Sequence, residues 1–154
     1  MFQWFLNWLE RKGRKSTIMD RDGIAPYLTR WYVAYPDGDQ RQRKDIPFNA
    51  FIHRFWQSDE PCIHTHPWNW SFSIILKGGY WEHLPDKTIW RGRGSFRLLR
   101  PDKSDKHWIE IPKGQEGKVW TLFVRGRTTH SWYFIENGVW VPWQEYLDMH
   151  RKIV

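Results

Sequence analysis

From Leu28 onward, hydrophobic positions fall in short runs rich in aromatic and β-branched residues, and turn residues separate the runs. This pattern predicts strands of an antiparallel sheet rather than the strand and helix alternation of a parallel one. We expect turns at 36–39, 77–79 and 136–138, where glycine and asparagine tolerate positive φ. The expected strands lie at 28–35, 48–56, 70–76, 80–84, 95–99, 107–111, 119–125 and 132–135.

The first segment has a different pattern. Trp4, Phe5, Trp8 and Leu9 recur at three- and four-residue spacings, which predicts one apolar face of an amphipathic helix. Such a helix either covers its own β-domain or lies on an anionic membrane surface beside the basic residues that follow it, and we favour the first. A second short helix is expected over 144–152.

Together these elements predict an N-terminal amphipathic helix and linker over 1–20, followed by a single all-β domain over 21–154. The length of 154 residues suits one domain. No apolar run approaches the roughly 20 residues of a membrane span, and no signal-peptide pattern is present, so we expect a cytoplasmic protein. A single cysteine excludes an internal disulfide framework and a multi-cysteine zinc site, which leaves histidines and carboxylates as metal ligands.

The formal net charge of +7 would suit a polyanionic partner such as nucleic acid. The basic residues form only a short cluster over 41–44 and a looser one over 91–100, and acidic residues lie among most of the others. We therefore favour a solvated basic surface and keep nucleic-acid binding as the lesser alternative. Thirteen tryptophans suit a packed interior and can also stack on a ligand ring.

The candidate chemistry lies in the histidines. His64 and His66 flank a single threonine before an expected strand, and residues i and i+2 of an extended chain point to the same face. Both imidazoles can then reach one metal ion, although same-face histidines are often merely hydrogen-bonded side chains. A glycine hairpin at 78–79, a returning strand that carries Glu82, and His107 in a later strand follow the pair.

This order of parts resembles the cupin superfamily, in which one motif carries H-x-H, a glutamate and a glycine turn, and a second motif adds another histidine. The resemblance implies a small antiparallel β-barrel of the jelly-roll (double-stranded β-helix) type, with a metal on His64, His66 and His107. The superfamily's usual glutamate position falls at Trp70 or Ser71, so its fourth ligand is missing. The chain is also similar to small cupin-like proteins of bacteria and phages that have no assigned reaction.

A closer resemblance is to thiol dioxygenases of the cysteine dioxygenase type. Residues 63–66 match that family's I-H-x-H, and residues 76–82 match its L-x-G-x-x-x-E. Thr29 and Arg30 look like the segment with the arginine that binds the substrate carboxylate, and 107–110 looks like the family's H-R-V-E. The family's later histidine and tyrosine have no counterparts over 120–124, so the resemblance covers the metal ligands better than the reaction.

Three neutral imidazoles on one side of an ion leave the opposite positions open, which permits catalysis. We favour Fe(II) and a non-haem iron dioxygenase-like enzyme that acts on a small anionic substrate. With Zn²⁺ or Mn²⁺ the same site would suit a sugar or nucleotide isomerase or hydrolase. A non-catalytic barrel that binds a small ligand or nucleic acid is the remaining hypothesis.

Further residues complete the candidate site. Arg30 and Arg54 are the candidates for binding the substrate anion, because a guanidinium pairs with a carboxylate or phosphate through two parallel hydrogen bonds. Glu82 is the candidate catalytic residue, and a fourth ligand or an acceptor that orients an imidazole are its other roles. A homodimer would cover exposed strand edges.

Overall fold

The computed structural model describes residues 2–36, 46–100 and 106–150. Two helices flank a body of strands, α1 (Phe2–Arg11) and α2 (Trp143–Met149). The strands are β1 (Lys15–Met19), β2 (Pro26–Tyr32), β3 (Asn49–Phe55), β4 (Ser71–Lys77), β5 (Gly79–His83), β6 (Thr88–Gly92), β7 (Phe96–Leu99), β8 (Trp108–Glu110), β9 (Val119–Arg125), β10 (Tyr133–Glu136) and β11 (Val139–Pro142).

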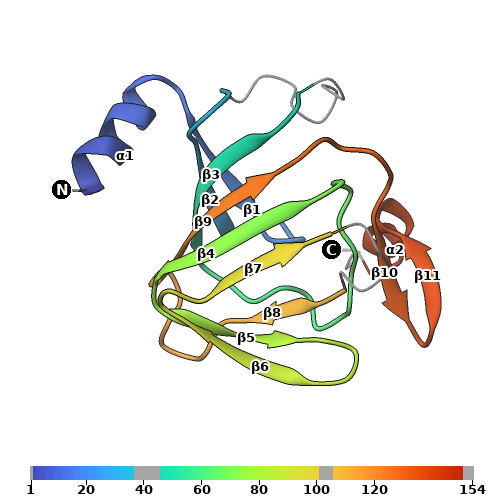
Figure 1. Ribbon diagram of the computed structural model, residues 1–154. Helices are drawn as coiled ribbons and strands as arrows, with labels where there is room; N and C mark the ends of the chain where they lie inside the picture. Colours follow the sequence, from blue (N-terminus) through green and yellow to red (C-terminus); the bar gives the residue numbers. More distant parts are fainter. Residues whose placement is uncertain (1, 37–45, 101–105, 151–154) are drawn as a thin grey trace.

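The strands form two main antiparallel sheets that face each other (Figure 1). The large sheet has the order β1-β2-β3-β9-β4-β7, and the small sheet has the order β6-β5-β8. The hairpin β10-β11 lies beside α2 at one side of the molecule. The prediction of an antiparallel, mostly β protein with a short helix near each end is therefore confirmed.

The predicted closed barrel is wrong, because the hydrogen bonding within the described ranges leaves both sheets open. The chain first crosses from the large sheet to the small one at a bend between β4 and β5. The register of β4 against β9 shifts between Ile75 and Lys77, and Gly78 then takes a φ of +72°. A Cβ on Gly78 would lie 3.0 Å from the Lys118 carbonyl oxygen, so glycine suits this bend. The result is a sandwich of two sheets.

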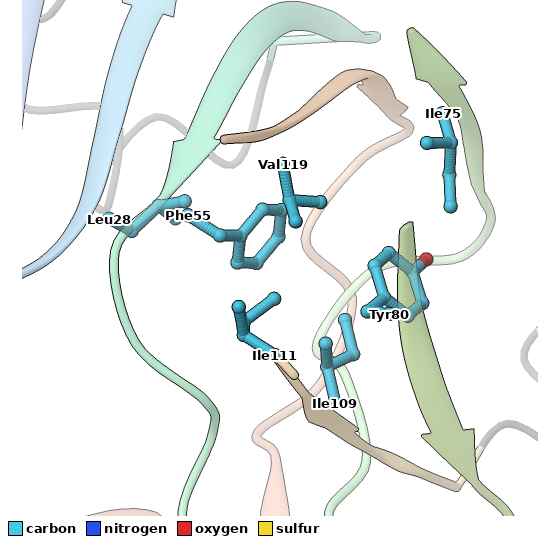
Figure 2. Close-up of a cluster of buried hydrophobic side chains, with 7 residues drawn as sticks. All are labelled: Leu28, Phe55, Ile75, Tyr80, Ile109, Ile111 and Val119. Carbon is cyan, nitrogen blue, oxygen red and sulfur yellow. The ribbon is translucent and has the colours of Figure 1, made fainter. Parts of the chain in front are cut away.

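A hydrophobic core fills the space between the sheets (Figure 2). The large sheet contributes Leu28, Phe55, Ile75 and Val119, while Tyr80, Ile109 and Ile111 come from the side of the small sheet. Because side chains alternate along each strand, positions two residues from these also face the interior. This parity decides which candidate residues can meet between the sheets.

Helix α1 packs on the outer face of the large sheet. Leu6 and Leu9 are buried against Trp31 and Ile52, whereas Trp4 stays 63% exposed. The expected packing of the helix on its own domain is thus present, and its outward aromatic residues keep the membrane alternative a hypothesis. Neither helix of the described ranges is long and apolar enough to cross a membrane.

Most predicted strands overlap strands of the structure, but the sequence missed β1, β6 and β11. Residues 15–19, which we expected in a linker, form β1 at the edge of the large sheet. The predicted turn near 136–138 is present, since Asn137 and Gly138 both have positive φ between β10 and β11. The turn at 36–39 beyond its first residue, the basic cluster over 41–44 and the end of the 144–152 helix lie outside the described residues.

Candidate metal centre

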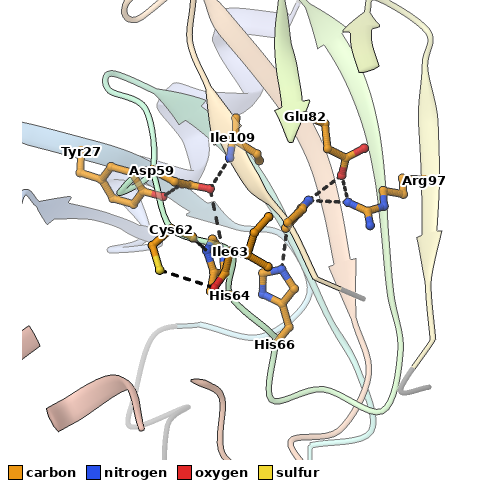
Figure 3. Close-up of polar contacts among 10 residues, drawn as sticks. Tyr27, Asp59, Cys62, Ile63, His64, His66, Glu82, Arg97 and Ile109 are labelled. Atoms are coloured by element: carbon orange, nitrogen blue, oxygen red, sulfur yellow. Dashed lines mark hydrogen bonds and ion pairs between the residues drawn. The ribbon is translucent and has the colours of Figure 1, made fainter. Parts of the chain in front are cut away.

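Backbone pairing brings the candidate histidines together. His64 donates its N–H to the carbonyl of His107 at 3.0 Å, and His107 returns a bond of 3.1 Å. On the other side, the backbone of Thr65 bonds to Tyr133 at the start of β10. The chain around Thr65 is therefore extended, which leaves His64 and His66 on one side of it. Segments 43 residues apart thus present three imidazoles to one point (Figure 3).

The three rings are close enough to share one ion. One nitrogen from each of His64, His66 and His107 lies within 4.8 Å of the others, and the Nε2 atoms of His66 and His107 are 2.8 Å apart. Two nitrogens bound to a metal at about 2.1 Å and at right angles would be about 3.0 Å apart. The donor set therefore fits a divalent metal with little movement of the rings.

Hydrogen bonds indicate which ring nitrogen of His64 and of His107 can bind a metal ion. Nδ1 of His64 lies 3.3 Å from the Cys62 carbonyl, which can only accept, so Nδ1 carries the proton and Nε2 keeps its lone pair. Nδ1 of His107 lies 2.5 Å from a Glu82 carboxylate oxygen and also contacts Nη1 of Arg97. We assign the proton to Nδ1 because the carboxylate can only accept. Burial, followed by neighbouring positive or imidazole groups, holds the pKa of His66 and of His107 well below the usual value. His66 and His107 are therefore neutral at neutral pH.

Glu82 lies behind the metal centre and does not face the shared point of the imidazoles. Its carboxylate is fully buried. Oε1 contacts both His107 and Arg97, while Arg91 donates to Oε2 at 2.8 Å. The arrangement suits an acceptor that orients His107, one of the roles weighed from the sequence. Glu82 also pairs with Arg91 and Arg97, two arginines of the looser basic cluster. These two arginines are therefore not available to bind a nucleic acid.

Asp59 lies beside the histidines, although no motif in the sequence pointed to it. Its Oδ2 atom is 3.9 Å from Nε2 of His64 and accepts from the backbone N–H of Ile109 at 2.8 Å. Tyr27 donates its hydroxyl proton to the other oxygen, and burial together with Asp59 raises the pKa of that hydroxyl well above the usual value. A carboxylate and a phenol therefore border the nitrogen that would bind the metal.

Aromatic rings form the wall beside the imidazoles. Trp68 stacks on His66 with ring centroids 5.2 Å apart, and Trp132 meets His64 edge to face. Trp68 in turn contacts Phe123, and Phe123 stacks on His53 at 5.2 Å. These contacts connect the metal centre to the interior face of β3 and β9.

The two arginines predicted to bind the substrate anion lie on opposite faces of the large sheet. Arg30 shares the interior face of the large sheet with Leu28 and donates from Nε to Nε2 of His53 at 3.1 Å. Arg54 is the partner of Thr29 in the register and faces outward, toward α1. It lies against the ring of Trp56, beside a cavity of about 370 Å³ under that helix. Arg54 is therefore not brought to the histidines.

No family model and no curated protein matches the sequence, but solved structures share its fold. A protein with a cupin-like fold from Ralstonia eutropha JMP134 has a TM-score of 0.54 at 10% identity, over 82% of this chain and 70% of that one. The Fe(II) form of HppE scores 0.52 at 14% identity, over 72% and 56%. A cupin-superfamily sugar phosphate isomerase from Silicibacter pomeroyi DSS-3 scores 0.52 at 14% identity, over 70% and 64%.

The chain has a cupin-like fold, and its histidine cluster is a candidate metal centre. At these identities the likeness shows the fold alone, and the chain spans 56% of HppE and 64% of the isomerase. The predicted cupin fold is thus confirmed, whereas the closer resemblance to thiol dioxygenases stays a prediction. The solved structures with this fold include the Fe(II) form of HppE and a sugar phosphate isomerase, so the fold itself does not choose between the two chemistries.

Proposed function

We propose that this chain is a metal-dependent enzyme of the non-haem iron, dioxygenase-like kind that acts on a small anionic substrate. The observation that carries the proposal is the convergence of His64, His66 and His107, two of which have Nδ1 engaged by an acceptor on the far side. A cluster that served only packing would have no need of this alignment of lone pairs. The proposal includes a soluble, cytoplasmic protein whose partner is a small molecule.

The residues of the chain have separate roles in this proposal. The three histidines would hold the metal on one side, and a bound Fe(II) ion would supply oxygen chemistry in which both atoms of O₂ end in the product. Glu82 is a positioning residue, since it fixes the orientation and tautomer of His107. Arg30 would bind the substrate anion from the interior face of β2, and Trp68 would limit the access of water to His66.

A second function has an observation of its own. The Asp59 and Tyr27 pair lies beside Nε2 of His64, where a carboxylate can accept a proton and a phenol can return one. This arrangement suits an isomerase or hydrolase with Zn²⁺ or Mn²⁺, acting on a sugar or nucleotide. The two functions differ in the metal they require, so the metal is the first property to measure.

The test is elemental analysis of protein purified without added metal. We expect about one iron per chain in the wild type, loss of iron in a His64→Ala, His107→Ala double variant, and full iron in His150→Ala. His150 is the matched control because it bonds only to Tyr146 and Glu136, away from the cluster. Wild-type oxygen consumption with small thiols and other carboxylates then identifies the reaction.

The outcomes separate the hypotheses. Near-stoichiometric zinc or manganese that the double variant loses would replace the oxygenase by the isomerase or hydrolase. Absence of metal from the wild type, even after incubation with Fe(II), Zn²⁺ and Mn²⁺, would refute the metal-dependent enzyme. A double variant that folds normally and keeps its iron would show that the metal binds elsewhere.

A further inference from the structure

The interior face of the large sheet carries a second arginine, Arg125, in addition to Arg30. Arg125 lies on β9, where alternation from the core residue Val119 directs positions 121, 123 and 125 between the sheets. Its side chain is buried, with 5% exposure. Charged side chains are almost never buried this far unless they are paired, so the partner of Arg125 has to be accounted for.

Neither arginine has a carboxylate partner in the part of the chain that the structure describes. Arg125 donates from Nη1 to the Gly126 carbonyl at 3.0 Å and lies 3.5 Å from the Thr128 hydroxyl, which leaves the donors on Nε and Nη2 unused. Arg30 uses only Nε, toward His53, and its guanidinium lies 5.0 Å over the ring of Phe51. The remaining donors of both groups are therefore available to a ligand.

Both guanidinium groups belong to the interior face of one sheet, where each positive charge disfavours the other. Burial is the main cause that lowers the pKa of Arg125, and the charge of Arg30 is the next. His53 adds no charge of its own, because burial and the same arginine hold its pKa well below the usual value. Two positive charges thus lie on one interior face with no carboxylate partner among the described residues, an arrangement that an anion would stabilise.

A buried hydroxyl next to Arg125 is also without a partner. Ser71 pairs with Arg125 in the register of β4 against β9, and its side chain is almost fully buried. Its Oγ atom makes no hydrogen bond within the described ranges. An unpaired buried hydroxyl costs free energy unless a ligand or a water satisfies it. Alternation from Ile75, a core residue, places Ser71 on the interior face too.

We propose that Arg30 and Arg125 together bind a substrate with two negative charges, a dicarboxylate or a phosphate monoester, and that the Ser71 hydroxyl donates to it. A dianion neutralises both guanidinium groups, whereas a monoanion leaves one buried charge uncompensated, so the site selects dianions. The aromatic contacts from His53 through Phe123 and Trp68 to His66 connect this anion site to the metal centre. The inference rests on the proposed function, for which it names the class of substrate.

The test is calorimetric titration of metal-free protein with inorganic phosphate, succinate and acetate at constant ionic strength. We expect the wild type to bind phosphate or succinate at least about tenfold more tightly than acetate. Arg125→Gln should weaken binding of that dianion by about 10- to 100-fold with little change for acetate. Arg127→Gln is the matched control, because Arg127 is exposed two residues further along the chain and should bind as the wild type does.

Stability measurements distinguish a binding role from a structural one. If Arg125 serves a ligand, Arg125→Gln removes an unpaired buried charge and should melt at or above the wild-type temperature without anion, and the added dianion should raise only the wild-type value. Arg125→Lys keeps the charge in case the glutamine variant does not fold, and it should lose most of the preference for dianions because a lysine lacks the fork.

Equal wild-type affinity for dianions and acetate, or an Arg125→Gln or Arg125→Lys variant that keeps the dianion preference, would overturn the inference. No measurable binding of either dianion by the wild type would overturn it as well. Metal content separates this failure from that of the proposed function. If the protein binds dianions but takes up no metal, the proposed enzyme function is refuted and the anion site stands. If it takes up metal but shows no preference for dianions, the anion site is refuted and the proposed enzyme function stands.

Discussion

Replacement of Glu82 by glutamine should weaken both the fold and the metal centre. The carboxylate is fully buried and pairs with Arg91, Arg97 and His107, while the two arginine side chains are 24% and 13% exposed. Removal of one partner from a buried charged network costs about 3 to 5 kcal/mol. Partial solvation of the arginines favours the lower end, so we expect the free energy of unfolding to fall by about 3 kcal/mol.

The same substitution should reduce metal affinity by about 10- to 100-fold, because the ring of His107 loses its charged acceptor. Urea unfolding of metal-free protein gives the first quantity, and competition with a chelator gives the second. Glu110→Gln is the control, since Glu110 also pairs with a histidine, His83 at 2.7 Å, but is 45% exposed. It should cost less than about 1 kcal/mol and leave metal affinity unchanged. Equal effects of the two substitutions would refute the reasoning.

Three further predictions concern pH, the interior bend and the N-terminal helix. Because the folded pKa values of His53, His66 and His107 are lowered, metal-free protein should lose up to about 4.1 kcal/mol of stability per pH unit below about pH 6.5, where only the unfolded chain gains these protons. Urea unfolding that is flat from pH 7 to 5 would contradict this. Gly79→Ala should cost about 1 to 3 kcal/mol, since its Cβ would lie 2.7 Å from a backbone carbonyl oxygen; a thermal melt like the wild type's would argue against that contact. Leu9→Ala should cost about 2 to 5 kcal/mol and Trp4→Ala less than about 0.5, and the reverse order in urea would show that α1 does not pack on the sheet as described.

The fold could be predicted largely from local patterns. Runs of aromatic and β-branched residues located most strands, and the spacing of His64 and His66 placed two imidazoles on one face. Strand β1 was missed because it is a half-exposed edge strand with a weak apolar signal. Closure of the sheets was mispredicted because the register shift near Lys77, which redirects the chain, has no signature in composition.

The candidate site was harder to predict because it depends on register between distant strands. Arg30 and Arg54 looked equivalent in the sequence, yet Arg54 pairs with Thr29, one position away from Arg30, and a shift of one residue reverses the face of a sheet. Asp59 and Arg125 had no local motif. Their significance arises only when the fold places Asp59 near His64 and puts Arg125 on the same interior face as Arg30.

Because a backbone bridge joins His64 to His107, binding of a metal by all three histidines would depend on folding. In an unfolded chain only the neighbouring pair His64 and His66 can chelate, because the third ligand is separated from His64 by 43 residues and meets it only through the tertiary structure. A metal held by this cluster would therefore bind the folded form preferentially and stabilise it, by about 2.7 kcal/mol at a free concentration of 100 times the dissociation constant. The metal supply would then govern how long the protein persists.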